Sequence, residues 1–377
     1  MAPADPLGLY LHIPFCAAIC YYCNFNRGLF DEDLKRRYVR ALNLEIDRAG
    51  DGTSVDSIYF GGGTPSLLEP DEVAHLLDCC RRRFGVTSDA EVTLELNPET
   101  ATVERMDGLR RAGVNRLSIG VQSFRDEELR RLGRLHSAER AREAVRLARA
   151  AGFDNLSIDL MLWLPEQTLA DWLASIEEVP ILGPDHVSLY LLELYPNAPL
   201  REEMARHTWS LAPDEDAAAM YLEALDRLEA AGYVQYELSN VARPGKRCRH
   251  NVKYWSDGEW LGFGCGAHST RHGCRWSNVA DTGLYVERLE AGERAIVDHR
   301  TLSPGERFGD AVFTGLRLTA GIDLAAIFER YGVEVAAEYG PAIEPYREAG
   351  LVVYQGDRLR LTRQGMLLAN EVMAVFV

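Results

Sequence analysis

The sequence predicts an α/β fold, namely a partial (β/α)6 barrel followed by a small C-terminal α+β domain of the winged-helix type. Six short segments alternate between aliphatic and polar residues with a period of two, as β-strands do. Helical patterns separate most of these segments, which favours parallel strands joined by helices. The alternation ends near residue 200, so the remainder of the chain is organised differently.

The six expected strands carry aliphatic side chains on one face and small or polar side chains on the other. They cover residues 8–13, 56–61, 91–97, 116–122, 155–161 and 186–192. An ordinary parallel sheet with helices on both sides is apolar on both faces. A barrel with helices outside and a polar ligand inside explains the polar face better. The active site of such a barrel lies at the C-terminal ends of its strands.

Apolar stripes at helical spacing lie between the strands and predict helices that pack on the outside of the barrel. The clearest stripes are Leu34, Tyr38, Leu42 and Ala49; Val73, Leu76 and Leu77; Ala141, Ala144, Val145 and Ala148; and Trp172, Ile176 and Val179.

The second half of the chain has a different pattern. The expected elements are a helix over 211–232, a strand over 233–239, loops over 243–274, helices over 305–318 and 324–331, a hairpin over 351–361 and a closing helix from residue 362. We therefore expect three units: the barrel in residues 1–240, a loop-rich connecting segment in 241–298, and the C-terminal domain in 299–377.

The bulk composition excludes several classes of protein. A net charge of −16, from 41 basic and 57 acidic residues, disfavours broad contact with nucleic acid. No apolar run approaches the ~20 residues of a membrane span, and the N-terminal residues lack the features of a signal peptide. We therefore expect a cytoplasmic protein whose eight cysteines are reduced.

Three cysteines follow the first strand with the spacing C-x3-C-x2-C: Cys16, Cys20 and Cys23. A closed zinc site takes four ligands, and a [4Fe–4S] cluster normally takes four thiolates. Three thiolates leave one iron open to an outside ligand, so the spacing favours a reactive cluster. Buried unliganded cysteines, or a zinc site with a distant fourth ligand, are the alternatives.

Polar residues end the later strands on the same face. Glu95, Gln122 and Asp159 are suited to bind a polar or cationic ligand, although surface acids are the alternative for any one of them. The guanidinium group of Arg134 could bind a carboxylate through two parallel hydrogen bonds. Composition alone favours the alternative, an exposed arginine at the end of a helix.

The cysteine run resembles the cluster loop of the radical S-adenosylmethionine (SAM) superfamily, in which the open iron binds the amino and carboxylate groups of SAM. Tyr22 occupies the aromatic position of that loop. Gly62, Gly63 and Thr64, after the second strand, resemble the glycine-rich motif whose backbone receives the methionine amino group. The resemblance implies a radical SAM barrel with a [4Fe–4S] cluster and SAM as cofactors.

Longer stretches resemble the oxygen-independent coproporphyrinogen III oxidase family over nearly the whole chain. They are residues 10–16, 61–66, 118–123, 158–161 and 164–168. The resemblance implies SAM contacts at these positions: Tyr10, Gly63, Thr64, Glu95, Gln122, Arg134 and Asp159.

Two departures point to one branch of that family. The oxidases add a fourth cysteine at the position of Phe25, and they carry a long extension where this chain has nine residues before Tyr10. Both departures match the HemW-type haem chaperones. Residues 249–255 resemble the HNxxYW haem-binding motif of that branch, with His250 as the expected ligand; a structural histidine is the alternative. Residues 262–269 resemble a GxGxGAHS stretch of the wider family, which does not separate the branches.

The resemblance implies a protein that cleaves SAM reductively, binds haem and delivers it to haem-dependent proteins such as respiratory enzymes, some of them membrane-associated. The electron donor would be a flavodoxin or ferredoxin. The rival functions are coproporphyrinogen III oxidation, methyl transfer from SAM, and haem carriage without SAM cleavage. Cys248, Cys265 and Cys274 could in principle bind a second metal, but their spacing in the sequence matches no familiar metal site.

Overall fold

The computed structural model describes residues 5–196 and 198–377, and its main element is a mixed sheet that curves around a polar interior. Six neighbouring parallel strands form the barrel: β1 (Leu7–Ile13), β4 (Ser54–Gly62), β5 (Gly85–Leu96), β6 (Arg116–Gln122), β7 (Leu156–Leu162) and β8 (His186–Leu191). The six predicted strands are therefore confirmed. The largest difference is at β5, which begins at Gly85 rather than at residue 91.

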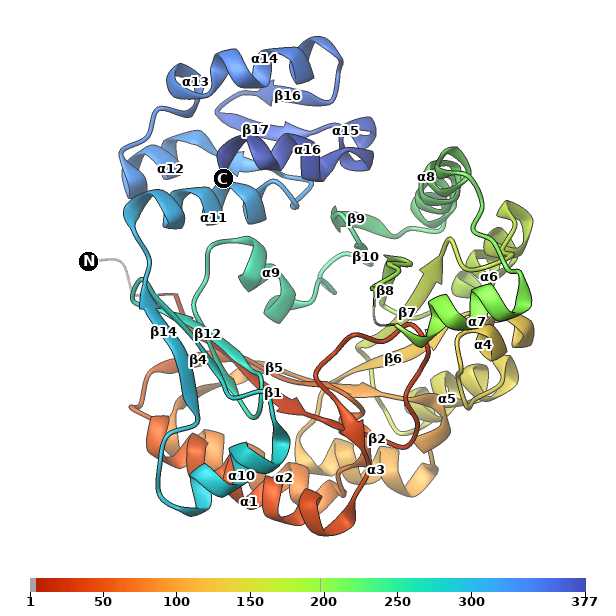
Figure 1. The fold of residues 1–377 in the computed structure, drawn as a ribbon, viewed down its shortest axis with the longest axis vertical. Helices are drawn as coiled ribbons and strands as arrows, with labels where there is room; N and C mark the ends of the chain where they lie inside the picture. The colour runs from red at the N-terminus through yellow and green to blue at the C-terminus, as the bar shows by residue number, and fades with distance from the viewer. Residues whose placement is uncertain (1–4, 197) are drawn as a thin grey trace.

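Helices cover the outer face of the barrel, where the aliphatic side chains of the strands lie. They are α1 (Glu32–Ala49), α2 (Pro70–Arg83), α3 (Val103–Ala112), α4 (Asp126–Arg131), α5 (Ala138–Ala150), α6 (Leu169–Leu182), α7 (Pro199–His207) and α8 (Asp214–Ala230). Figure 1 shows α1, α2 and α3 along the outside of the sheet. The predicted stripes lie in one hydrophobic core, except that Ala49 is exposed at the end of α1. Cys79 and Cys80 of α2 are buried in the same core.

The prediction of loops over residues 243–274 is wrong. The structure has α9 (Arg249–Trp255), β11 (Trp260–Phe263), β12 (His268–Arg271) and β13 (Cys274–Asn278) in or next to this range. β11 pairs in parallel with β1, and β12, β13 and β14 (Ile296–Thr301) extend the sheet further. α10 (Thr282–Glu290) lies between the last two of these strands. The strands are short, and Gly264 and Gly266 have φ angles of 100° and 67°, so turns interrupt the alternation that would have indicated strands.

Two more short strands extend the opposite edge of the sheet. β10 (Asn240–Ala242) pairs with β8, and β9 (Val234–Glu237) pairs with β10, both antiparallel. The predicted strand over 233–239 is confirmed in this shorter form.

Figure 1 shows α9 on the inner side of the curved sheet. The buried carboxylate of Glu91 accepts hydrogen bonds from the backbone N–H groups of Arg249 (3.2 Å) and His250 (3.3 Å) at the first turn of α9. The His250 ring lies over Gly8 of β1, where a Cβ would come within 3.0 Å of it. α9 therefore packs against β1 and β5 near Gly8 and Glu91, on the N-terminal side of the residues that line the cavities described below.

The C-terminal part has its own hydrophobic core and forms the upper body in Figure 1. Its helices are α11 (Pro304–Gly315), α12 (Leu324–Tyr331), α13 (Val335–Glu338), α14 (Gly340–Glu348), α15 (Arg363–Leu367) and α16 (Ala369–Met373). Its strands are β15 (Ile322–Asp323), β16 (Val352–Gln355) and β17 (Arg358–Leu361), all antiparallel. The predicted helices and hairpin are confirmed, while the exact boundaries of the three units stay a prediction.

Several side-chain and backbone contacts join this body to the barrel, and those of Arg317 are among them. Arg317 forms an ion pair with the buried Glu237 (3.1 Å), and its guanidinium lies 4.2 Å from the centre of the Trp255 ring. Across the described ranges, no helix is long and apolar enough to cross a membrane.

Candidate functional site

A cavity of about 330 Å³ opens at the C-terminal ends of the barrel strands, and we call it the cysteine cavity. It is lined by eleven of the residues singled out in the sequence: Cys16, Cys20, Tyr22, Cys23, Gly62, Gly63, Thr64, Glu95, Gln122, Arg134 and Asp159. The polar face of successive strands therefore converges on one place, as the alternation predicted.

The three cysteines reach the cavity from one loop. Cys16 ends β2 (Phe15–Cys16), which pairs with β3 (Gly28–Leu29), and Cys20 and Cys23 lie in the connection. Backbone hydrogen bonds from Tyr21 to Leu132 (3.0 Å) and from Leu200 to Tyr21 (2.9 Å) fix that connection. The loop is thus anchored while its sulfurs face the cavity.

All three thiols are free, and burial raises the pKa of Cys16 and of Cys23. A bound cation reverses this effect, because a coordinating thiol is deprotonated. Among the residues that the structure places, no group of three His, Cys, Asp or Glu side chains is close enough to hold a single metal ion. The donor set fits an iron–sulfur cluster, which spreads its thiolates over several irons.

The glycine-rich stretch is fastened directly to the cysteine loop. The N–H groups of Gly63 and Thr64 donate to the carbonyls of Ile13 and Phe15, both at 2.8 Å. A Cβ at Gly63 would lie 2.8 Å from the Phe15 carbonyl oxygen and 3.0 Å from Cys16 Sγ. Only glycine fits there without displacing the first cysteine.

Two carboxylates face the cavity without an ion pair in the described part of the chain. Glu95 accepts hydrogen bonds from the Tyr59 hydroxyl (2.9 Å) and the Gly62 N–H (3.1 Å), and Asp159 accepts one from Ser118 (3.2 Å). Burial, together with the charge of Asp159, raises the pKa of Glu95 to about 7. Burial likewise raises the pKa of Asp159. Such a pair is suited to a cationic ligand.

Arg134 is a fixed part of the cavity wall rather than an exposed helix end. Its Nη2 donates to Asn97 Oδ1 and to the Gly120 carbonyl, both at 2.9 Å, and its Nη1 lies 3.4 Å from Cys20 Sγ. Its Nε is buried and has no hydrogen-bond partner among the described residues. A further acceptor supplied by a ligand would satisfy that donor.

Asn97 is a lining residue that the sequence analysis missed. Its Nδ2 donates to Thr64 Oγ1 at 2.9 Å, while its Oδ1 holds Arg134, so it joins the glycine-rich stretch to the arginine. The sequence could have indicated this role, because Asn97 comes two residues after Glu95 and residues two apart share a face of a strand. Gln122, at the end of β6, is buried and has a φ angle of 68°, a strain that is common where a side chain is aimed at a ligand.

Tyr10 does not line the cysteine cavity. It lines a neighbouring cavity of about 360 Å³ together with His12, Phe25, Asn26, Gly62, Glu95, Tyr254, Trp260, Gly266, Ala267 and His268; we call it the His268 cavity. The two cavities share Phe25, Gly62 and Glu95, so they meet at the end of β4. The Tyr10 hydroxyl lies 3.1 Å from His12 Nδ1.

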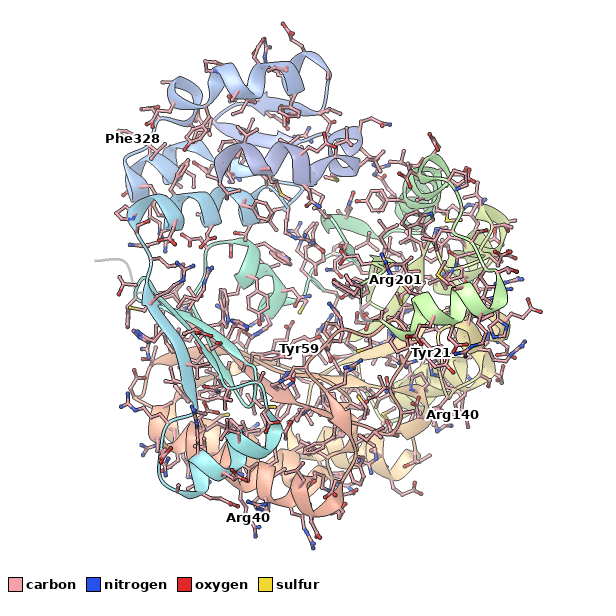
Figure 2. The ribbon with its side chains drawn as sticks, in the orientation of Figure 1. Tyr21, Arg40, Tyr59, Arg140, Arg201 and Phe328 are labelled. Atoms are coloured by element: carbon pink, nitrogen blue, oxygen red, sulfur yellow. The ribbon has the colours of Figure 1, made fainter. Side chains whose placement is uncertain are left out.

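His250 lines neither cavity and is only 1% exposed. Its Nδ1 lies 3.1 Å from the Ser57 hydroxyl and its Nε2 lies 2.8 Å from the Tyr254 hydroxyl. Its ring stacks on Tyr59, which Figure 2 shows on the inner side of the sheet. Burial lowers the pKa of His250 to about 3, so the ring is neutral. Haem ligation by His250 stays a prediction, and it would require Tyr254 to move.

The other cysteines have separate surroundings. Cys248 contacts Glu91, Cys265 contacts Asn26, and Cys274 contacts Thr301. In the described residues these three thiols do not form a metal-binding group.

Comparison with known proteins relates the chain to one set of relatives over its full length. Residues 10–179 match the model of the radical SAM superfamily, and residues 302–368 match the HemN C-terminal domain. Heme chaperone HemW of Bacillus subtilis (strain 168) is 35% identical over 373 residues, which are 98% of each chain. Heme chaperone HemW of Mycobacterium tuberculosis (strain ATCC 25618 / H37Rv) is 39% identical over 98% of this chain and 95% of its own.

The solved structure of coproporphyrinogen III oxidase (HemN) from Escherichia coli, a radical SAM enzyme, superposes with a TM-score of 0.86 at 26% sequence identity. The match covers 99% of this chain and 90% of that one. The barrel and the C-terminal body therefore have the same arrangement in both proteins.

Proposed function

Because the chain belongs to the HemW family within the radical SAM superfamily, we propose that it binds haem and delivers it to haem-dependent proteins, using SAM and a [4Fe–4S] cluster bound in the cysteine cavity. The observation that carries the proposal is the convergence of three thiols, a glycine-rich stretch and two unpaired carboxylates on one cavity of a full-length relative of haem chaperones. The superfamily implies the cluster and SAM, and the name of the relatives supports haem.

Cys16, Cys20 and Cys23 would hold the cluster. No other cysteine of the described chain lines the cavity, so one iron would remain open to SAM. When bound and reduced, the cluster supplies one electron that cleaves SAM into methionine and a 5′-deoxyadenosyl radical. The electron would come from a flavodoxin or ferredoxin.

The remaining lining residues would hold SAM. The backbone around Gly62 and Gly63 would receive the amino group, with Thr64 beside it, and the unpaired Nε of Arg134 would reach the carboxylate. Glu95 and Asp159 would face the cationic part and the ribose hydroxyls, and Gln122 would add an amide. Tyr10 would act from the neighbouring cavity, and Tyr22 would pack beside the last cysteine.

SAM affinity is expected to depend on pH through Glu95. Burial and the charge of Asp159 raise its pKa to about 7, and a bound cation favours the carboxylate form, so binding releases a proton below that pH. Affinity should therefore rise by up to about tenfold per pH unit as the pH approaches 7 from below, and level off above it. Titration calorimetry between pH 5.5 and 8.5 measures this.

The matched controls are Glu95→Gln and Glu45→Gln. Glu45 is partly buried and also has a pKa raised to about 7, but it lies outside the cysteine cavity, so its replacement should leave the pH profile unchanged. Glu95→Gln should bind SAM more weakly with a flat profile. A steep profile that persists in Glu95→Gln would show that another group takes up the proton.

The proposed function is tested by haem binding and transfer. The full chain, reconstituted anaerobically with iron and sulfide, should bind about one haem per chain and release it to an apo haem protein with a distinct absorption spectrum. A protein that binds no haem but converts coproporphyrinogen III to protoporphyrinogen would be an oxidase instead. Methyl transfer from labelled SAM to a small molecule would equally contradict the proposal.

A further inference from the structure

The His268 cavity contains an accessible imidazole beside the site proposed for SAM. His268 is the first residue of β12, its side chain is exposed, and no hydrogen bond to its ring occurs within the described residues. His250, by contrast, is buried and has both ring nitrogens engaged. A neutral imidazole with an accessible nitrogen is what a haem iron requires.

The backbone of His268 is held firmly, which would fix the position of the ring. The Trp260 indole N–H donates to the His268 carbonyl at 3.0 Å. A Cβ at Gly262 of the neighbouring strand would lie 2.3 Å from the same carbonyl oxygen, so a glycine is needed for this close packing. The ring therefore extends from a rigid strand end rather than from a mobile loop.

The walls of the cavity supply aromatic surface. The rings of Tyr254 and Trp260 meet edge to face with 4.7 Å between their centres. Phe25 lies at the junction of the two cavities and is 63% exposed, which is unusual for a large apolar side chain. A flat apolar macrocycle would cover these rings.

The cavity is also tied to the cysteine loop. Asn26, three residues after Cys23, donates to the carbonyls of Cys265 (3.1 Å) and Ala280 (2.9 Å), and His12 Nε2 lies 2.7 Å from the Asn26 carbonyl oxygen. These hydrogen bonds connect the turn before His268, which contains Cys265, to the loop that is proposed to bind the cluster.

We infer that the His268 cavity is the haem site and that His268, rather than His250, is the side chain that ligates the haem iron. The inference rests on the proposed function, since it assumes that haem binds. In this arrangement His250 and Tyr254 form the floor of the barrel beneath the haem. Trp260 and Phe25 would offer aromatic surface to the porphyrin, next to the cysteine cavity.

The test is an anaerobic haem titration of the reconstituted full chain, with Kd and the absorption and EPR signature of the ligated iron as readouts. His268→Ala should weaken haem binding by at least about tenfold and lose the signature of histidine ligation, which added imidazole should restore. SAM affinity should not change. His272→Ala is the matched control, because His272 is exposed on the turn after the same strand but lies outside the cavity.

The outcomes separate the inference from the function on which it rests. Unchanged haem affinity and spectrum in His268→Ala, with a wild type that binds haem, would overturn the inference alone. Loss of binding in His250→Gln but not in His268→Ala would return the ligand to His250. A wild type that binds no haem would overturn the proposed function and the inference together.

Discussion

Replacing Cys16, Cys20 or Cys23 individually with serine is expected to remove most of the iron from the anaerobically reconstituted protein, to below about a tenth of the wild-type content. The three sulfurs line one cavity from a single anchored loop, and no fourth cysteine of the described chain lines that cavity to compensate. SAM binding should be lost with the cluster, because the open iron would hold the amino and carboxylate groups. Iron and sulfide analysis, visible absorption and EPR after reduction measure the loss.

Cys274→Ser provides the matched control, since Cys274 is a free, partly buried cysteine outside the cavity. It should retain wild-type iron and SAM affinity. Stoichiometric zinc in the wild type, or a full iron content in any of the three loop variants, would be incompatible with the proposed cluster.

Gly63→Ala should have the second-largest effect. The added methyl group would lie 2.8 Å from the Phe15 carbonyl oxygen and 3.0 Å from the Pro14 carbonyl carbon, which are backbone atoms, and 3.0 Å from Cys16 Sγ. The glycine-rich stretch and the cysteine loop would have to separate, at a cost of about 1–3 kcal/mol. We expect less than half of the wild-type cluster content and a SAM affinity reduced by at least about tenfold, measured by iron analysis and calorimetry.

Gly28→Ala is the appropriate comparison for this substitution. Gly28 lies in β3, beside Phe15, but a Cβ there would have no neighbour within 4 Å. It should keep both cluster and SAM. Equal behaviour of the two alanine variants would show that the close approach at Gly63 has no bearing on the cofactor site.

The barrel and most of its polar lining could be predicted because a period of two fixes which residues share a face. Glu95, Gln122 and Asp159 each follow from their place on the polar face of a strand, and the parallel strands direct that face toward one cavity. Asn97 and the fixed position of Arg134 could not be predicted in the same way. Their roles depend on hydrogen bonds between segments that are far apart in the sequence.

The segment around His250 was the least predictable part of the chain. Strands of four residues separated by glycine turns carry too little alternation to be recognised. The burial of His250 is set by Ser57 and Tyr59 of a distant strand rather than by its own neighbours in the sequence. A motif can therefore identify a residue without showing whether a ligand can reach it.

The parallel pairing of β1 with β11 has a consequence for how the chain acquires its structure. Gly8 pairs with Trp260, so the ribosome synthesises β11, one of the two neighbours of β1, about 250 residues after β1 itself. Contacts of such long range slow folding, since a large loop must close before they form. During synthesis β1 would therefore keep one unpaired edge until β11 has left the ribosome, long after β4 has become available on its other side.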